Sequence, residues 1–385
     1  MEDWINAGLI ILLWVINLFL GTNIDKNYHI TEYVRVIIYI ITVNTLFLVS
    51  KRKTRYIVKE QSIVLCMMAF FILCSLINGY GGQAFNYIWV FLVTFLISKL
   101  KITQKLTIII GIAYGIAGYL VLILFSREIL FNGWNSNSIA MIGLQSYVIS
   151  LIPFYSEGIK WKKIVIYLIT LIYTINIWGT NSRGGILFMF LGAAFALNLI
   201  SPDILCKDTR RILFILFIPL FIALIIISFS HNHWILSLND FSEEFFQKSL
   251  FNGRDRIWEL GLQICCMDLF LGNGNIASGN WHNSAVTCLV AYGGIGYIIW
   301  IAVFKKMLIK GKVFIEDRFV QASYIMFIII YLQQSVDLGI ISIQPSLLPY
   351  LLLGIMLGRC NYLIRLEGKE TNNCQYLGSG KNELI

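Results

Sequence analysis

The chain has 385 residues, of which 58% are hydrophobic and only 13% are charged. Charged residues make up about a quarter of a soluble globular protein, so this composition excludes a soluble globular fold and indicates an integral membrane protein. The 30 Lys and Arg outnumber the 21 Asp and Glu, but they gather in short connections between apolar runs. That placement indicates membrane topology and argues against a nucleic-acid partner.

Apolar runs long enough to cross a bilayer, which takes about 20 residues, recur along the chain. The first run follows an acidic start and lacks a small-residue cleavage site, so we expect a retained span and not a cleaved signal peptide. Gly111, Gly115 and Gly118 lie on one side of the fifth run and predict close packing against another helix. In all we expect twelve transmembrane helices, at residues 4–21, 34–50, 60–78, 83–98, 106–125, 137–155, 164–179, 184–200, 212–230, 284–304, 319–335 and 346–364.

The sequence thus predicts an all-α, polytopic membrane domain over residues 1–366, followed by a polar, flexible tail at 367–385. Basic residues are concentrated in alternate connections between the spans, for example in 51–59 and 305–318. The positive-inside rule places these connections and both termini in the cytoplasm. The interval 231–283 then forms one large extracytoplasmic loop.

The eight cysteines show none of the C-x-x-C or Cys/His spacings that are typical of zinc sites. Four of them, Cys66, Cys74, Cys288 and Cys360, lie in or at apolar runs, where a small buried side chain is the usual role of a cysteine. The sequence therefore predicts no metal site.

The longest polar-rich interval, 250–296, contains residues suited to an anionic substrate. If its segment 253–260 is helical, Arg254 and Trp258 share one face at i,i+4, whereas Arg256 lies elsewhere and can pair with Glu259. Guanidinium groups suit phosphate. Arg254 is therefore the better candidate for a substrate contact, and Arg256 the better candidate for a structural ion pair.

A Trp-His-Asn sequence, with His282 and Asn283, stands at the mouth of the predicted span 284–304. Imidazole transfers protons near neutral pH. A histidine at a helix start is often a cap or a solvated group, but this one shares its loop with arginines, which favours catalysis. His231 and His233, at the far end of the loop, remain competitors.

Two further groups lie at predicted outer span ends. Asn135 and Asn137 open the span 137–155, where they either cap the helix or attract an anion to its free N–H groups. Arg183, within Ser182-Arg183-Gly184-Gly185, opens the span 184–200 at the positive end of the helix dipole. The alternatives for Arg183 are a phosphate contact, favoured by glycines that let the backbone approach a ligand, or a place at the membrane interface.

In their order along residues 130–300, these motifs resemble those of the O-antigen ligase and Wzy-type polysaccharide polymerase family. The family's N-P-N-x-x-A element is similar to Asn135–Ala140, with Ser136 in place of proline, and its S-R-G-G element matches residues 182–185. Its G-R-x-x-x-W element matches Gly253, Arg254 and Trp258, whereas a related R-x-x-x-L pattern fits Arg256 and Leu260 and leaves the second arginine ambiguous. Its G-x-G turn and its H-x10-G element match Gly272, Gly274, His282 and Gly293.

The resemblance implies a GT-C-type membrane glycosyltransferase on the outer face of the bacterial cytoplasmic membrane, with no cofactor and no metal. Its donor would be an oligosaccharide on undecaprenyl pyrophosphate. Arg183 and Arg254, with Arg256 as the alternative, would bind the pyrophosphate. His282 would act as general base toward the acceptor hydroxyl, with inversion at C1.

Within this family we expect a polysaccharide polymerase, which joins lipid-linked repeat units; the alternative is a ligase that moves finished glycan to a lipid A core or a protein. The implied partners are the lipid-linked oligosaccharide and membrane lipid, together with a chain-length regulator and a flippase of the same pathway. An alternative hypothesis from another functional class is a polysaccharide flippase or exporter. A flippase should carry its cations inside its spans and needs no large outer loop.

Overall fold

The computed structural model describes residues 2–19, 44, 59–130, 135–155, 161–230, 232–246, 249–337, 339–342 and 346–379. All regular structure within these residues is helical, which confirms the all-α class. The helices are α1 Glu2–Phe19, α4 Lys59–Ile77, α5 Gly81–Ser98, α6 Gln104–Ser126, α7 Ser136–Ser150, η1 Ile152–Tyr155, α8 Lys162–Trp178, α9 Arg183–Ala196, α10 Asp203–Cys206, α11 Thr209–Phe229, α12 His233–Phe246, α13 Arg254–Met267, η2 Ile276–Ser278, α14 Ser284–Val313, α15 Arg318–Gln333 and α16 Leu347–Ser379.

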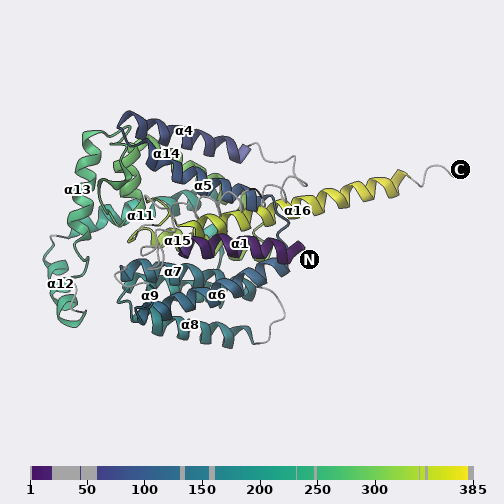
Figure 1. The fold of residues 1–385 in the computed structure, drawn as a ribbon, viewed down its shortest axis with the longest axis horizontal. Coiled ribbons are helices and arrows are strands. Elements are labelled where there is room, and N and C mark those ends of the chain that lie inside the picture. Colours follow the sequence, from purple (N-terminus) through teal and green to yellow (C-terminus); the bar gives the residue numbers. More distant parts are fainter. Residues whose placement is uncertain are drawn as a thin grey trace.

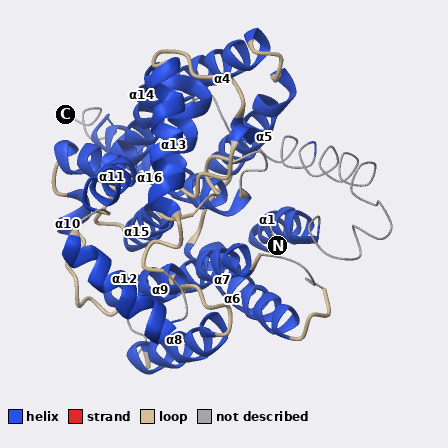
Figure 2. Cartoon of the chain, turned by 90° about the vertical axis from the view of Figure 1, so that its left-hand side faces the viewer, coloured by secondary structure: helices blue, strands red, loops and turns tan. Residues whose placement is uncertain are grey.

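Most of these helices lie side by side along one direction, with the start of α1 and the end of α16 at the same end of the bundle (Figure 1). Helices α12 and α13 lie across the opposite end, which faces the viewer in Figure 2. This end is called the α12/α13 end below. The interval predicted as a large loop therefore contains two helices and the short η2.

Helices occupy eleven of the twelve predicted span positions. The twelfth, 34–50, lies outside the described residues except for Asn44. Five segments among the described residues are long and apolar enough to cross a membrane: Gln104–Ser126, Ser136–Tyr155, Thr209–Phe229, Ser284–Val313 and Leu347–Leu366. These helices support a membrane location. The segment predicted as a tail is described as far as Ser379 and is helical there.

The predicted glycine seam of α6 is confirmed. A Cβ atom at Gly111, Gly115 or Gly118 would overlap Pro153, Ser150 or Ser146, respectively, on α7 and η1. The absence of side chains on this face lets α6 and α7 approach closely, as small residues do in membrane helix pairs. The seam fixes α7, whose first turn lines the candidate site described below.

Helix α14 is broken at Gly293, where the sequence predicts one continuous helix. Gly293 has φ 63° and ψ −171°, a backbone conformation open almost only to glycine. A Cβ atom there would overlap the carbonyl group of Phe270. The break therefore depends on a glycine that brings α14 into backbone contact with the segment 269–274.

Backbone hydrogen bonds replace those that the break removes from α14. The N–H groups of Asn273 and Gly274 donate to the carbonyl oxygens of Val290 and Ala291, at 2.9 and 2.8 Å. In return, Gly294 N–H donates to the carbonyl oxygen of Leu269 at 2.7 Å, and Ile295 N–H to that of Phe270 at 3.4 Å. Buried backbone groups need such partners, above all inside a membrane. We call these four backbone hydrogen bonds, between residues 269–274 and residues 290–295, the glycine lock.

The predicted Gly-Asn-Gly turn forms the other half of the lock. Gly272 and Gly274 have φ values of +69° and +67°. A Cβ atom at Gly272 would lie 2.6 Å from the backbone of Tyr292, and one at Gly274 would lie 2.6 Å from the carbonyl oxygen of Cys74. Three glycines from two predicted motifs thus form one junction, at the start of the chain segment that leads to His282.

Candidate active site

Two pockets at the α12/α13 end meet at one carboxylate, Asp337. The first, here called the arginine pocket, has an empty volume of about 470 Å³. The second, the histidine pocket, has an empty volume of about 1180 Å³. Asp337 lines both and follows the end of α15.

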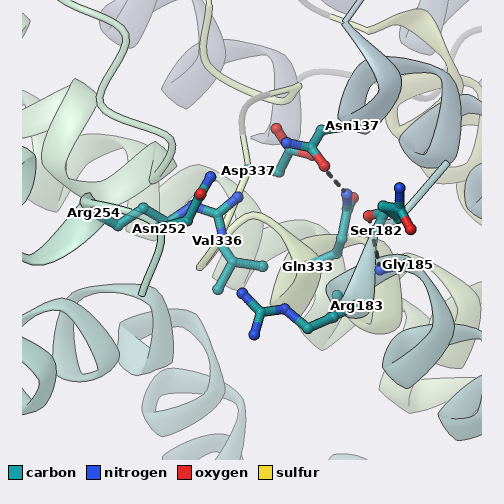
Figure 3. Close-up of a pocket in the computed structure, with 11 residues that line it drawn as sticks. Asn137, Ser182, Arg183, Gly185, Asn252, Arg254, Gln333, Val336 and Asp337 are labelled. Atoms are coloured by element: carbon teal, nitrogen blue, oxygen red, sulfur yellow. Dashed lines mark hydrogen bonds between the residues drawn. The ribbon is translucent and has the colours of Figure 1, made fainter. Parts of the chain in front are cut away.

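The arginine pocket is formed by four segments distant in sequence: the start of α7, the turn before α9, the turn before α13 and the end of α15. Arg254 and Arg183 enter it from different sides, with Val336 between them (Figure 3). Its lining residues are Asn137, Asn181, Ser182, Arg183, Gly184, Gly185, Asn252, Arg254, Gln333, Val336 and Asp337.

Arg254 is the first residue of α13, so the segment 253–260 is helical from Arg254 onward, with Gly253 as the N-cap. Its Nε atom is buried and has no hydrogen-bond partner among the described residues. Burial lowers the pKa of the Arg254 guanidinium, while the nearby Asp337 carboxylate raises it and Arg183 lowers it further. An arginine keeps its proton despite such a shift. Arg254 therefore brings a partly desolvated positive charge to the pocket.

Arg183 lines the same pocket and also connects three elements. Its Nη1 donates to Ser242 Oγ on α12 at 2.9 Å, and its Nη2 donates to the carbonyl oxygen of Ser249 at 2.9 Å and of Leu250 at 3.4 Å. Ser182 caps α9 by accepting from Gly185 N–H at 3.3 Å. Arg183 thus connects the start of α9 to α12 and to residues 249–250, which precede α13. This structural role was not predicted from the sequence.

His282 lines the histidine pocket, and its Nδ1 lies 3.9 Å from Asp337 Oδ1. That distance brings the two groups within the range of a charge interaction but beyond a hydrogen bond. Nδ1 is buried without a hydrogen-bond partner, while the side chain as a whole is 21% exposed. The ring is therefore exposed along an edge other than Nδ1. Its backbone has φ +49°, a left-handed conformation that is uncommon for a residue with a side chain.

Both neighbours of His282 are anchored, which fixes that backbone conformation. The indole Nε1 of the buried Trp258 donates to the carbonyl oxygen of Trp281. Asn283 caps α14 by accepting from the N–H groups of Ala285 and Val286. The Asn283 amide also donates to the carbonyl oxygens of Pro219 and Ser335, each at 2.9 Å. Trp258 and Asn283, both members of the motifs described above, hold the two neighbours of His282 in place.

The remaining predicted residues divide between the two pockets and other surroundings. Asn135 lines the histidine pocket and caps α7 by accepting from Asn137 N–H at 2.9 Å, and Asn137 lines the arginine pocket. Arg256 is exposed, lines neither pocket and makes no ion pair with Glu259, both of which are described.

The competing histidines lie elsewhere or are not described. His233 opens α12 and lines a separate surface pocket with Trp234, Leu238 and Phe241. His231 lies outside the described residues. Among the described residues no group of three His, Cys, Asp or Glu side chains could hold a metal ion.

Asp337 is the functional candidate that the sequence analysis missed. It ends a polar run, Gln333-Gln334-Ser335-Val336-Asp337, that begins inside the predicted span 319–335. The run is a usable signal, because polar groups at a membrane helix end need partners or a ligand. Gln333 Nε2 donates to Asp337 Oδ2 at 3.5 Å (Figure 3).

The chain matches no protein-family model, and no curated protein is significantly similar to it.

Proposed function

We propose that this chain is a membrane glycosyltransferase that joins lipid-pyrophosphate-linked oligosaccharide repeat units into a polysaccharide. The observation that carries the proposal is the meeting of a cationic pocket and a histidine pocket at Asp337. Transfer of a glycan from a pyrophosphate needs both parts: positive charge for the leaving group, and a base for the attacking hydroxyl.

In the proposed reaction, the arginine pocket holds the pyrophosphate of the donor lipid. The acceptor hydroxyl attacks C1 of the donor sugar, so that a new C1–oxygen bond forms as the bond from C1 to the pyrophosphate oxygen breaks. Arg254 and Arg183, which line this pocket from different sides, stabilise the charge that grows on the departing pyrophosphate. Because arginine stays protonated in a partly buried site, no metal is required for this role.

His282 accepts the proton of the acceptor hydroxyl through its exposed ring edge. The resulting imidazolium is positively charged, and the Asp337 carboxylate, 3.9 Å from Nδ1, stabilises that charge. Attack from the face opposite the leaving pyrophosphate inverts the configuration at C1. The glycine lock, Trp258 and Asn283 keep the imidazole at this position.

The proposed topology has twelve spans, a GT-C-like architecture and both termini in the cytoplasm of a bacterium. It is supported by the shared position of the two ends of the described chain (Figure 1). The helix ends and connections at that end of the bundle include the basic segments 99–105, 207–211 and 305–318. Under the positive-inside rule that end is cytoplasmic, so both pockets open toward the outer face.

One observation favours a second class of function. Discontinuous helices such as α14 are typical of transporters, in which they form the substrate site. The cations that line the arginine pocket, however, lie at helix N-termini and not within spans. A flippase or exporter is therefore the less supported proposal.

A strain that lacks the gene tests the proposal through its surface glycan ladder. Complementation with the wild-type protein should restore a ladder, whereas His282→Ala or Arg254→Ala should leave single repeat units at equal protein expression. Arg256→Ala is the matched control, because it removes an arginine of the same helix that lines neither pocket; it should restore the ladder.

Other outcomes separate the alternatives. Fully polymerised glycan retained on its lipid carrier in the deletion strain would identify a ligase. Lipid-linked repeat units accumulating on the inner leaflet would identify a flippase. A full ladder from His282→Ala would show that His282 is not the base.

A further inference from the structure

The histidine pocket differs in charge from the arginine pocket that it adjoins. No Lys or Arg lines it among the described residues, and its only carboxylate is Asp337. The undescribed gaps nearest to it in sequence, 131–134, 338 and 343–345, contain no charged residue either. Apart from His282 and Asp337, its polar lining side chains carry hydroxyl or amide groups: Asn135, Ser138, Asn280, Thr287, Ser342 and Ser346.

These neutral groups stand on walls that internal hydrogen bonds hold in place. On one wall, Gln83 Nε2 donates to Asn275 Oδ1 at 3.0 Å, and Ile276 N–H donates to Gln83 Oε1 at 2.9 Å. These bonds fix the segment 275–277. A pocket that is formed before the ligand arrives recognises shape and charge at low entropic cost.

Another part of the wall is formed by residues in 339–342 and by Ser346, which hydrogen bonds hold at three points. Ile340 N–H donates to Gln334 Oε1 at 2.8 Å, and Ser342 N–H donates to the Tyr87 hydroxyl at 3.1 Å. Ser346 Oγ donates to the buried Gln145 Oε1 at 2.8 Å. Hydroxyl and amide groups on a fixed wall suit the hydroxyls of a sugar, each of which donates and accepts hydrogen bonds.

We propose that the histidine pocket binds the acceptor sugar and selects one that carries no negative charge. This inference rests on the proposed function, because the hydroxyl that His282 deprotonates must lie in the pocket that His282 lines. The acceptor is then the non-reducing terminal sugar of the incoming repeat unit, either a neutral hexose or an N-acetylhexosamine.

Electrostatics excludes an acidic acceptor, such as a uronic acid, for two reasons. Its carboxylate would face Asp337 with no lysine or arginine on the described lining of the pocket to offset the repulsion. The two arginines of the neighbouring pocket are engaged by the donor pyrophosphate when the reaction occurs, so they cannot neutralise a further anion. Like charges at close range reject a ligand even where its shape fits.

Linkage analysis of the native glycan tests this inference directly. The acceptor is the sugar that is terminal in the single repeat units of the deletion strain but substituted in the wild-type polymer. We expect that sugar to be uncharged. A uronic acid, or another anionic sugar, at that position would overturn the inference and leave the polymerase proposal intact. Identical glycans in the two strains would overturn the proposed function, and the inference with it.

A transfer assay with the purified full-length protein in proteoliposomes adds a second readout. The acceptors are the lipid-linked repeat unit from the deletion strain and the same unit with its terminal sugar oxidised to a uronate. We expect transfer to the uronate to be at least about tenfold slower. Equal rates would overturn the inference.

The ratio of the transfer rate with the neutral acceptor to the rate with the uronate acceptor should fall when a cation is added to the pocket. Ala277 lines the pocket with an exposed side chain that makes no polar contact, so Ala277→Lys introduces a positive charge there, and Ala277→Gln is the uncharged control of similar length. We expect the lysine variant to narrow the ratio at least about threefold, and the glutamine variant to leave it unchanged. An unchanged ratio in both variants would contradict the electrostatic explanation.

Discussion

Substitution of Gly293 by alanine should destabilise the protein through the glycine lock. A side chain at φ 63° and ψ −171° costs about 1–3 kcal/mol in backbone strain. The added Cβ overlaps the carbonyl group of Phe270, and overpacking of this kind costs a further ~1–3 kcal/mol. Gly293→Ala should therefore reduce the free energy of unfolding by about 2–6 kcal/mol.

Gly294→Ala provides the matched control at the next position. Gly294 has no positive φ, and its added Cβ would meet only the carbonyl oxygen of Leu269, at 3.3 Å. Alanine also favours a helix over glycine by about 1 kcal/mol. The net change for Gly294→Ala should therefore stay within about 1 kcal/mol of zero.

The assay is equilibrium unfolding of each purified variant in mixed micelles, followed by glycan transfer of the folded fraction. We also expect folded Gly293→Ala to transfer glycan more slowly than the wild type. The glycine lock sets the start of the segment that leads to His282, so its loss should displace the imidazole. Equal stability of Gly293→Ala and Gly294→Ala would refute the lock as a source of stability.

Three further predictions concern charged residues. Asp337→Asn keeps the shape of the side chain but removes the charge that stabilises the imidazolium. The rate of glycan transfer should therefore fall at least about 100-fold without loss of folding. An unchanged transfer rate in the purified variant would remove Asp337 from the mechanism. Arg254→Ala should lower kcat/KM by roughly 10²–10³, whereas Arg256→Ala should stay within about twofold of wild type; a larger loss from Arg256→Ala would reverse their assignment. Arg359 forms a 2.7 Å ion pair with Asp317 at the other end of the bundle. Arg359→Met should leave a partly buried carboxylate without its cation and lower the free energy of unfolding by roughly 3 kcal/mol. A free energy of unfolding equal to that of the wild type would show that the ion pair contributes nothing.

The helical framework could be predicted from the sequence because membrane spans are encoded locally, in the length and hydropathy of single runs. The Gly-Asn-Gly turn and the seam of α6 were predictable for the same reason. The break in α14 was not, because it depends on a backbone contact between Gly293 and Phe270 that no local pattern reveals. Sequence spacing alone makes Gly293 look like an ordinary small residue in a helix.

In the candidate site, too, the locally encoded features were predictable and the non-local contacts were not. His282 and Arg254 were predicted by residue type and position at helix starts. Asp337 was missed because it follows His282 by more than fifty residues and is brought beside it only by the packing of α14 against α15. The hydrogen bonds of Arg183 to Ser242, Ser249 and Leu250 are non-local in the same way.

The decisive experiment for the polymerase proposal is glycan transfer by the purified protein in liposomes, with a lipid-pyrophosphate-linked repeat unit as the only added substrate. We expect the wild type to release lipid pyrophosphate and to lengthen the glycan by whole repeat units, and we expect His282→Ala to do neither although it folds. Chain extension by His282→Ala, or release of pyrophosphate lipid without a longer glycan in the wild type, would contradict the proposal.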